Sequence, residues 1–184
     1  MRIKKFAARY KQHILKLNGF RCSVTLVIVL FSLLGLKLQA QSPFPPPSQL
    51  QVYATQELAF GSFFTGSSGG TVTISPEGSR SVTGTVTGLA LDNGSAAVFD
   101  LRLVPGRVVH IVLPTSAQLT HSSGGETMTI TNFSTDKPGN QFVTAASHPF
   151  INPVQIGATL NVQHSAANPP GDYTGSFNIT FIQE

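Results

Sequence analysis

The stretch 172–182 reads DYTGSFNITFI and decides the fold class of this chain. Its apolar side chains share one face: Tyr173, Phe177, Ile179 and Phe181. Ser, Thr and Asn fill most positions between them. Because alternate side chains of a strand point to opposite faces, this pattern predicts one face in a core and one in water. Gly175 falls on the apolar face, where its missing side chain would admit a bulky neighbour or a bulge.

The same kind of sequence extends back to residue 50. Ser and Thr are frequent, glycines recur throughout, and no ten-residue apolar face with the helical period occurs. Nine short strands are predicted, over residues 50–60, 70–75, 79–87, 96–104, 107–113, 117–121, 126–133, 155–163 and 172–182. Turn residues fill gaps between them, at 76–78, 92–94, 105–106, 123–125 and 137–140. Eight or nine antiparallel strands at this spacing predict an all-β fold, a β-sandwich or barrel.

The segment 127–133 repeats the alternation and then breaks it. Met128 and Ile130 share one face, whereas Phe133 is out of register with them. An extra residue in one strand shifts the register in this way. We therefore predict a β-bulge near Thr131 or Asn132.

The first 40 residues differ in composition from the rest. They carry eight of the twelve Lys and Arg residues and none of the eight acids. A basic region, 1–21, precedes an uncharged apolar run, 22–36, which is the pattern of a secretory signal peptide. We expect a signal peptide over residues 1–40, cleaved after Ala40, with an uncleaved membrane anchor as the alternative. In both cases the remainder is exported, to the periplasm, the cell surface or the medium.

The exported part, 41–184, carries four Lys and Arg residues and eight acids, a net charge of 4 − 8 = −4. This excludes a nucleic-acid-binding face, which needs clustered Lys and Arg. The only cysteine of the chain, Cys22, lies in the apolar run, so the exported part offers no disulfide, thiol nucleophile or Cys-ligated metal. Residues 41–49 hold four prolines and predict an extended spacer. Residues 50–184 suit a single domain.

Seven short segments follow one another in an order typical of a known family. They are 58–61 (LAFG), 70–74 (GTVTI) with 76–80 (PEGSR), 98–99 (VF), 111–114 (IVLP), 128–130 (MTI) with Phe133, 156–162 (IGATLNV) and 171–177 (GDYTGSF). Together, over residues 50–182, they resemble the domain of unknown function 4402 family of exported bacterial domains. The chain departs from the family pattern at Ala158, where a second Gly is usual, and in its ending, 181–184. The resemblance implies an immunoglobulin-like or pilin-like β-sandwich, similar in architecture to fimbrial subunits, with no established activity.

The sequence holds no strong motif for catalysis. The nucleophile motif G-x-S-x-G is absent. Asp100 and His110 flank the turn at 105–106, so in a hairpin of 96–104 with 107–113, His110 would lie beside Asp100 or Arg102. We interpret this as a surface pair across two strands. No catalytic residue is predicted, and the chain is not expected to be an enzyme.

Metal ligands are not clustered in the sequence either. Asp92, Asn93 and Gly94 begin like a calcium loop, but Leu103 stands where such a loop needs Glu, so a turn is predicted. The histidines of the exported part lack the spacing of a local zinc site: His110, His121, His148 and His164. Most acids fall in or beside predicted turns, so no carboxylate pair for glycoside hydrolysis is predicted. No metal and no other cofactor is expected.

Phe63 and Phe64 are the one aromatic pair on a predicted loop edge, 63–70. The exported part has no Trp, and sugar-binding sandwiches commonly use exposed aromatic side chains. These two residues are therefore the predicted ligand contacts. The alternative is that Phe63 or Phe64 closes one end of the core.

Two functions remain open at this point. The first is a structural or adhesive surface module that assembles with its own copies or another envelope protein by edge-strand addition. The candidate donor is the alternating segment 50–54, which alternatively forms the first strand of its own domain. The second function is a module that binds a glycan or another surface polymer through Phe63 and Phe64. Contact with a membrane is expected only through the N-terminal segment, if it is retained.

Overall fold

The computed structural model describes residues 47–184. The predicted signal peptide, 1–40, and most of the predicted spacer, 41–49, lie outside the described residues. From residue 47 to residue 184, no helix is long and apolar enough to cross a bilayer. The helical structure in this range is one 3-10 turn, η1 (Pro138–Asn140).

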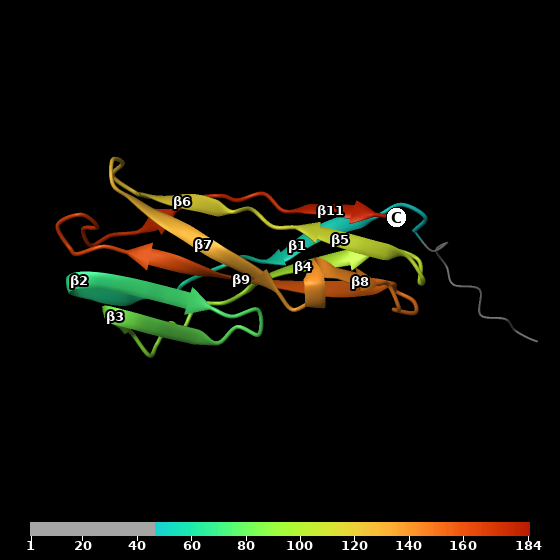
Figure 1. The fold of residues 1–184 in the computed structure, drawn as a ribbon, viewed down its shortest axis with the longest axis horizontal. Coiled ribbons are helices and arrows are strands. Elements are labelled where there is room, and N and C mark those ends of the chain that lie inside the picture. The colour runs from blue at the N-terminus through green and yellow to red at the C-terminus, as the bar shows by residue number, and fades with distance from the viewer. Residues whose placement is uncertain (1–46) are drawn as a thin grey trace, which may run out of the picture. The chain divides into compact units, whose positions relative to one another are not determined.

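The described residues form an all-β fold consistent with a sandwich (Figure 1). Its strands are β1 (Gln51–Gln56), β2 (Phe63–Ile74), β3 (Arg80–Gly88), β4 (Ala97–Arg102), β5 (Val108–Val112), β6 (Ser116–His121), β7 (Thr127–Thr135), β8 (Gln141–Val143), β9 (Ile151–Val162), β10 (Tyr173–Thr174) and β11 (Thr180–Gln183). All strand pairs are antiparallel. The predicted all-β antiparallel class is confirmed, with eleven strands in residues 47–184 where eight or nine were predicted.

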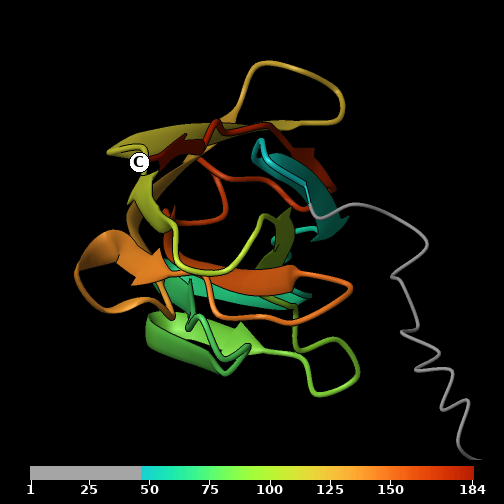
Figure 2. The ribbon, with the colours of Figure 1, turned by 90° about the vertical axis from the view of Figure 1, so that its right-hand side faces the viewer.

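The strands belong to one large and one small sheet. The large sheet has the order β1-β4-β9-β7-β6-β10, and β2 joins it by pairing with β9 on one side and β3 on the other. The small sheet has the order β11-β5-β8. The long strand β9 pairs with β4 through its first half and with β2 through its second, so it organises the large sheet (Figure 1). Seen from the end, β2 and β3 (green) lie on one side of the domain and the C-terminal β11 (red) lies on the other (Figure 2).

The core has two parts, each built from the alternating apolar residues of several strands. The first part lies on β2, β7 and β9: its largest buried members include Val72, Ile74, Ile130 and Leu160. The second lies between β4, β5 and β9, around Leu101, Val109, Val154 and Ile156. Leu58 and Phe133 pack against both parts. Burial of alternate side chains, as in β2 at Val72 and Ile74 and in β7 at Met128 and Ile130, is what the period-two pattern predicts.

The C-terminal stretch that decided the fold class is divided between the two sheets. β10 pairs with β6 of the large sheet, whereas β11 pairs with β5 of the small sheet. The prediction of one continuous strand over 172–182 was therefore wrong, because the structure has two strands there, β10 and β11. The predicted role of Gly175 is confirmed, because a Cβ there would collide with the backbone oxygen of Gln118 in β6.

The predicted hairpin of 96–104 with 107–113 is wrong. Both edges of β4 are occupied, by β1 and β9, so the chain after residue 105 crosses to the small sheet. Asp100 pairs with Tyr53 and Pro153, and His110 pairs with Ile182 and Gln141. The predicted pairing of His110 with Asp100 or Arg102 is consequently absent.

Other element boundaries also differ from expectation. The predicted strand 50–60 ends at Gln56, and Ala59 makes an isolated bridge to Ser95. The structure adds the short β8, which was not predicted. The bulge predicted in β7 is confirmed, since the register to β9 shifts between Thr131 and Ser134 and Asn132 has a φ of 52°.

Candidate functional site

A cleft of about 720 Å³ opens onto the first part of the core. Its floor contains buried apolar side chains of β7 and β9: Met128, Ile130, Leu160 and Val162. Its walls come from residues 57–65 on one side and from residues 165–177 on the other. Apolar clefts with a few polar groups on the rim are the usual form of a binding site.

Phe63 and Phe64 both line this cleft. Phe63 is half-buried and packs against the first part of the core, whereas Phe64 is 56% exposed. The loop predicted over 63–70 is wrong, because both residues belong to β2, which pairs with β3 through Phe63 and Gly88. The strand continues through the glycines of 66–70 because a bulge absorbs them, with Gly69 at a φ of 73°.

The opposite wall, 165–172, is held by a buried asparagine. Asn168 accepts a hydrogen bond from the backbone N–H of Gln163 at 2.7 Å and donates to the backbone oxygen of Thr127 at 3.0 Å. This side chain is 4% exposed, so its hydrogen bonds offset the cost of burying an amide. Sequence reasoning missed Asn168, because nothing separates it from a surface residue in sequence.

Tyr173 closes the same wall from β10. Its hydroxyl donates to the backbone oxygen of Pro169 at 2.9 Å, and its ring meets the imidazole of His121 edge-on at 4.9 Å. Burial raises the pKa of the Tyr173 phenol, with a smaller contribution from Glu126, so the hydroxyl remains a donor. His121 in turn bonds Ser123 Oγ through Nδ1 at 2.6 Å and Pro170 O through Nε2 at 3.2 Å.

Residues 175–179, which follow β10 at the border of the cleft, have backbone N–H and C=O groups that are not paired with another strand in the part of the chain that the structure describes. From residue 47 to residue 184, no other segment shares a backbone–backbone hydrogen bond with residues 175–179. β10 and β11, which flank this stretch, each have a neighbouring strand on one side alone. Phe177 nevertheless points its side chain inward, against Phe133 at a ring distance of 5.1 Å. The cleft thus combines an apolar floor with a free strand edge.

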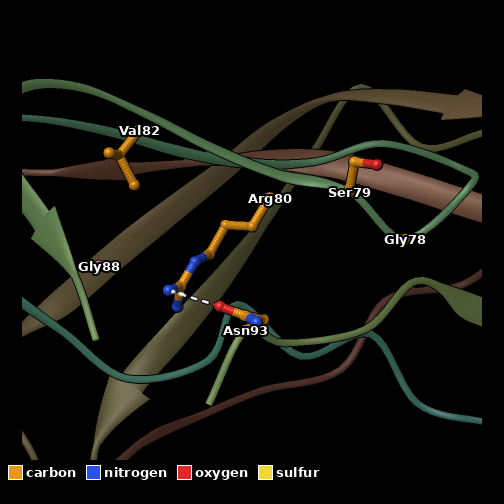
Figure 3. A pocket seen from close by; sticks show the side chains of 6 residues that line it. All are labelled: Gly78, Ser79, Arg80, Val82, Gly88 and Asn93. Carbon is orange, nitrogen blue, oxygen red and sulfur yellow. Dashed lines mark hydrogen bonds between the residues drawn. The ribbon is translucent and has the colours of Figure 1, made fainter. Parts of the chain in front are cut away.

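A second hollow, of about 460 Å³, lies beside Arg80 on β3 (Figure 3). The guanidinium donates to the backbone oxygens of Asp92 and Leu89 at 2.6 and 2.7 Å, to that of Ser62 at 3.2 Å and to Asn93 Oδ1 at 3.1 Å. These acceptors come from two loops, so Arg80 fastens both loops to β3. A fork of five N–H groups makes this possible. The group is committed to the fold and is not free for a ligand.

The predicted turn at 92–94 supplies two of the acceptors of Arg80, and the side chain of Asp92 makes further hydrogen bonds. The carboxylate accepts hydrogen bonds from Ser62 Oγ at 2.8 Å and from the N–H of Gly94 at 3.3 Å. These bonds, the one from Ser62 first, together with the charge of Arg80, lower the pKa of Asp92. Among residues 47–184, no three His, Cys, Asp or Glu side chains gather as metal ligands would.

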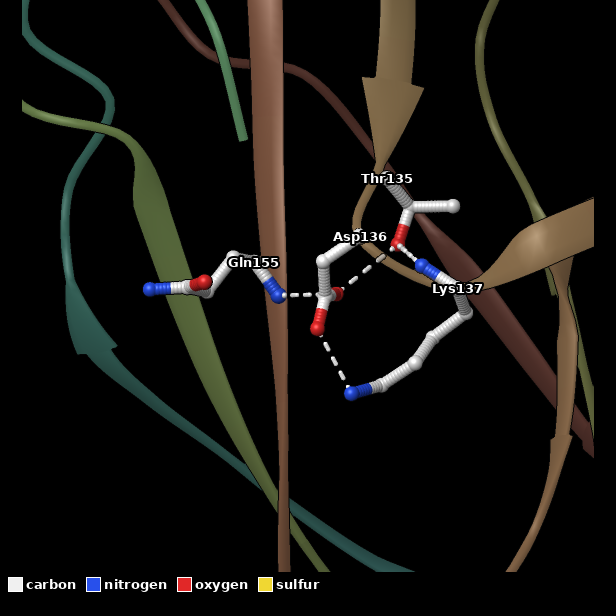
Figure 4. Close-up of polar contacts among 4 residues, drawn as sticks. All are labelled: Thr135, Asp136, Lys137 and Gln155. Carbon is white, nitrogen blue, oxygen red and sulfur yellow. Dashed lines mark hydrogen bonds and ion pairs between the residues drawn. The ribbon is translucent and has the colours of Figure 1, made fainter. Parts of the chain in front are cut away.

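The remaining sequence candidates are dispersed. His110 Nε2 lies 3.3 Å from Glu184 Oε1, and His148 stacks edge-on with Phe150. Asp136 anchors the end of β7 to β9: its Oδ1 accepts the N–H of Gln155 at 2.8 Å and its Oδ2 accepts Lys137 Nζ at 2.6 Å (Figure 4). These contacts hold strands together. The cleft, in contrast, leaves apolar surface and backbone groups open to a partner.

The family comparison agrees with the segments found in the sequence. The family model described as domain of unknown function (DUF4402) matches residues 50–182. No curated protein and no solved structure matches the chain. The matched range runs from just before β1 to within β11, so it contains both walls of the cleft. The chain therefore belongs to the DUF4402 family.

Proposed function

We propose that this protein is an exported, non-enzymatic module of the cell envelope or surface, structural or adhesive in role, that assembles by strand addition at the cleft. The observation that carries the proposal is the apolar floor bordered by residues 175–179, whose backbone has no partner segment within 47–184. In strand addition, main-chain hydrogen bonds supply affinity and alternate side chains enter apolar depressions. The cleft offers both.

The proposed donor is the segment 50–54 of a second copy. Leu50, Val52 and Ala54 alternate with polar or amphipathic residues, as an inserted strand requires. In the monomer this segment contributes to β1, which pairs with β4. Every side chain of β1 is exposed, so backbone hydrogen bonds are its main attachment. Transfer of this segment to another sheet edge uncovers no buried side chain of β1, although it gives up the packing of Leu50 on the second part of the core.

Light scattering after size exclusion on residues 41–184 tests the proposal. Lysine on an edge strand opposes strand addition. We expect Ser176→Lys with Asn178→Lys, both at exposed positions of the free edge, to convert concentration-dependent oligomers into monomers. The matched control places Ser81→Lys with Thr87→Lys on β3, the edge at the other end of the large sheet, and should still form oligomers.

Two outcomes would contradict the proposal. A parent protein that remains monomeric at every concentration excludes assembly. Equal loss of oligomers in both lysine variants places the contact elsewhere than the cleft. Deletion of residues 42–54 tests the donor separately: a folded protein that still forms the same oligomers would rule out segment 50–54.

A second candidate function is ligand binding in the same cleft, for a glycan or another surface polymer. The observation that favours it is the exposure of Phe64 at the cleft wall, with the aromatic ring of Tyr173 among the lining residues. Aromatic rings supply large contact areas at small entropic cost. A glycan array with the Phe64→Ala variant distinguishes it from assembly.

A further inference from the structure

The outer face of five adjacent strands carries an ordered array of hydroxyl and amide side chains. The strands are β3, β2, β9, β7 and β6, which lie side by side in that order (Figure 1). Strand register places one row across all five: Ser81, Thr73, Thr159, Thr131 and Ser116. A second row runs beside it: Thr83, Thr71, Asn161, Thr129 and Gln118. We call these ten residues the hydroxyl face.

The hydroxyl face points away from the core. Its residues alternate along β2, β7 and β9 with buried apolar ones, such as Val72, Ile130 and Leu160. Neighbouring strands are about 4.8 Å apart and residues of one face repeat every ~6.8 Å along a strand, so the polar groups form a regular grid. No position of either row holds a charged side chain. The grid therefore presents hydrogen-bond donors and acceptors but no charged group.

Hydrogen bonds link five hydroxyl groups and one amide within the face. Thr71 Oγ1 lies 2.7 Å from Thr83 Oγ1, and Thr73 Oγ1 lies 3.0 Å from Thr159 Oγ1. Asn161 Nδ2 donates to Thr131 Oγ1 at 3.0 Å. A hydroxyl has one donor and two acceptor sites, so each of these pairs keeps capacity for another partner. Because β-branched side chains are stiff at χ1, little entropy is lost when a partner binds.

We propose that the hydroxyl face binds a linear, neutral, hydroxyl-rich glycan. Such a polymer has no charge, which matches a face that would attract neither an anionic nor a cationic chain. Its rings present hydroxyl edges and C–H faces in alternation, and each threonine offers a hydroxyl and a methyl group. This site is separate from the cleft, whose lining contains none of the ten residues.

The twist of the sheet favours a flexible chain over a planar lattice. Adjacent strands rotate by roughly 20–25° on average, so the grid turns steadily over five strands. A rigid plane, such as the surface of ice, would touch only part of the grid. A polysaccharide chain can follow the turn, because its linkages rotate.

Affinity electrophoresis of residues 41–184 in gels containing hydroxyethyl cellulose, a neutral glucan, tests this site. We expect retardation that persists from low to high salt, since screening weakens only charge-driven binding. Thr73→Val with Thr159→Val removes both partners of one hydrogen bond while keeping the side-chain shape, which changes stability little. This variant should bind about tenfold more weakly, as the loss of one to two net hydrogen bonds implies. The matched control, Thr55→Val with Thr180→Val, lies off the face and should bind as the parent does.

The other possible results would place the binding on a different surface or assign it a different cause. Unchanged binding in Thr73→Val with Thr159→Val, or no retardation of the parent, would overturn the proposal. Retardation by anionic polygalacturonate that disappears with salt would show a charge-driven contact instead. Inhibition of ice growth without retardation by the glucan would assign the face to a lattice. Loss of retardation in Phe64→Ala would place the glycan in the cleft and overturn the proposal.

Discussion

Arg80 Nη1 donates a hydrogen bond of 2.6 Å to the backbone oxygen of Asp92, twelve residues further along the chain. The bond joins β3 to the loop that precedes β4, and the same guanidinium reaches Leu89 and Ser62. A lysine could not replace Arg80 here. The planar guanidinium of arginine points its N–H groups in several directions and reaches all of these acceptors at once, whereas the lysine ammonium is a compact point charge.

We therefore expect Arg80→Lys and Arg80→Ala both to destabilise the fold. The free energy of unfolding should fall by about 2 kcal/mol, since several acceptors lose their donor together. Urea denaturation measures the change. Arg102→Ala is the control, because Arg102 is exposed and lies over the exposed ring of Tyr53, at 5.2 Å from its centroid, so that its loss should cost less than about 1 kcal/mol. Equal losses at the two positions would contradict the special role of Arg80.

Acid should weaken the fold partly through Asp92. Its pKa is lowered in the folded protein, mainly by the hydrogen bond from Ser62. A lowered folded pKa gives stability above the unfolded pKa, and this stability is lost as the pH falls through the folded value. Asp92→Asn should therefore lose less stability between neutral and acid pH than the parent. Urea midpoints across that range test this, and a parallel decline of both proteins would refute it.

Gly175→Ala should detach the C-terminal stretch from β6. The new Cβ would collide with the backbone oxygen of Gln118, which cannot rotate away as a side chain would. We expect a loss of about 1–3 kcal/mol, typical of overpacking. Gly139→Ala is the control, because a Cβ there meets nothing within 4 Å and only its positive φ is unfavourable. Thermal melting that ranks the two variants in the opposite order would count against the close approach.

Asn168 is expected to be the strongest single polar anchor of the cleft wall. Asn168→Ala leaves the N–H of Gln163 and the backbone oxygen of Thr127 without their partner. Because the site is buried, the free energy of unfolding should fall by about 2–3 kcal/mol. Hydrogen exchange should show the loss of protection first in 163–172. Protection lost first in β4 or β5 would show that Asn168 does not hold this wall.

Alanine variants of Phe63 and Phe64 should distinguish an effect on stability from an effect on ligand binding. Phe63→Ala removes a side chain packed on the core and should lower stability by about 2 kcal/mol. Phe64→Ala removes an exposed ring and should change stability by less than about 0.5 kcal/mol. These results would support the alternative that Phe63 closes one end of the core. A ligand signal that survives Phe64→Ala would exclude that ring as a contact.

Local alternation of apolar and polar residues was enough to predict most of the strands. It could not predict which strands pair with one another, because pairing depends on residues far apart in the sequence. The alternation in 172–182 correctly gives the buried face, with Phe177 and Ile179 packed on the core. It cannot tell that β10 and β11 join different sheets. The pairing of Asp100 with His110 failed for a related reason, since a turn signal at 105–106 does not say whether the chain returns in the same sheet.

The candidate site was predicted in part. Phe63 and Phe64 were identified by type, and both line the cleft, but the loop assigned to them is a strand. Five glycines and serines in 66–70 resemble a loop, whereas a bulge lets β2 continue past them. The opposite wall depends on the long-range hydrogen bonds of Asn168, which no local pattern records.

The backbone N–H of Leu50 donates to Gln183 Oε1 at 3.0 Å, so the residue before β1 and the last residue of β11 lie side by side. Tension applied through these two residues would peel β1 from β4 one pair at a time, which requires less force than shearing the ladder as a whole. β1 has six residues and buries none of their side chains. Its release would add about 20 Å of extended chain without opening the core. Under a load applied at Leu50, this strand would separate before the core opens, and it would pair again when the load is removed.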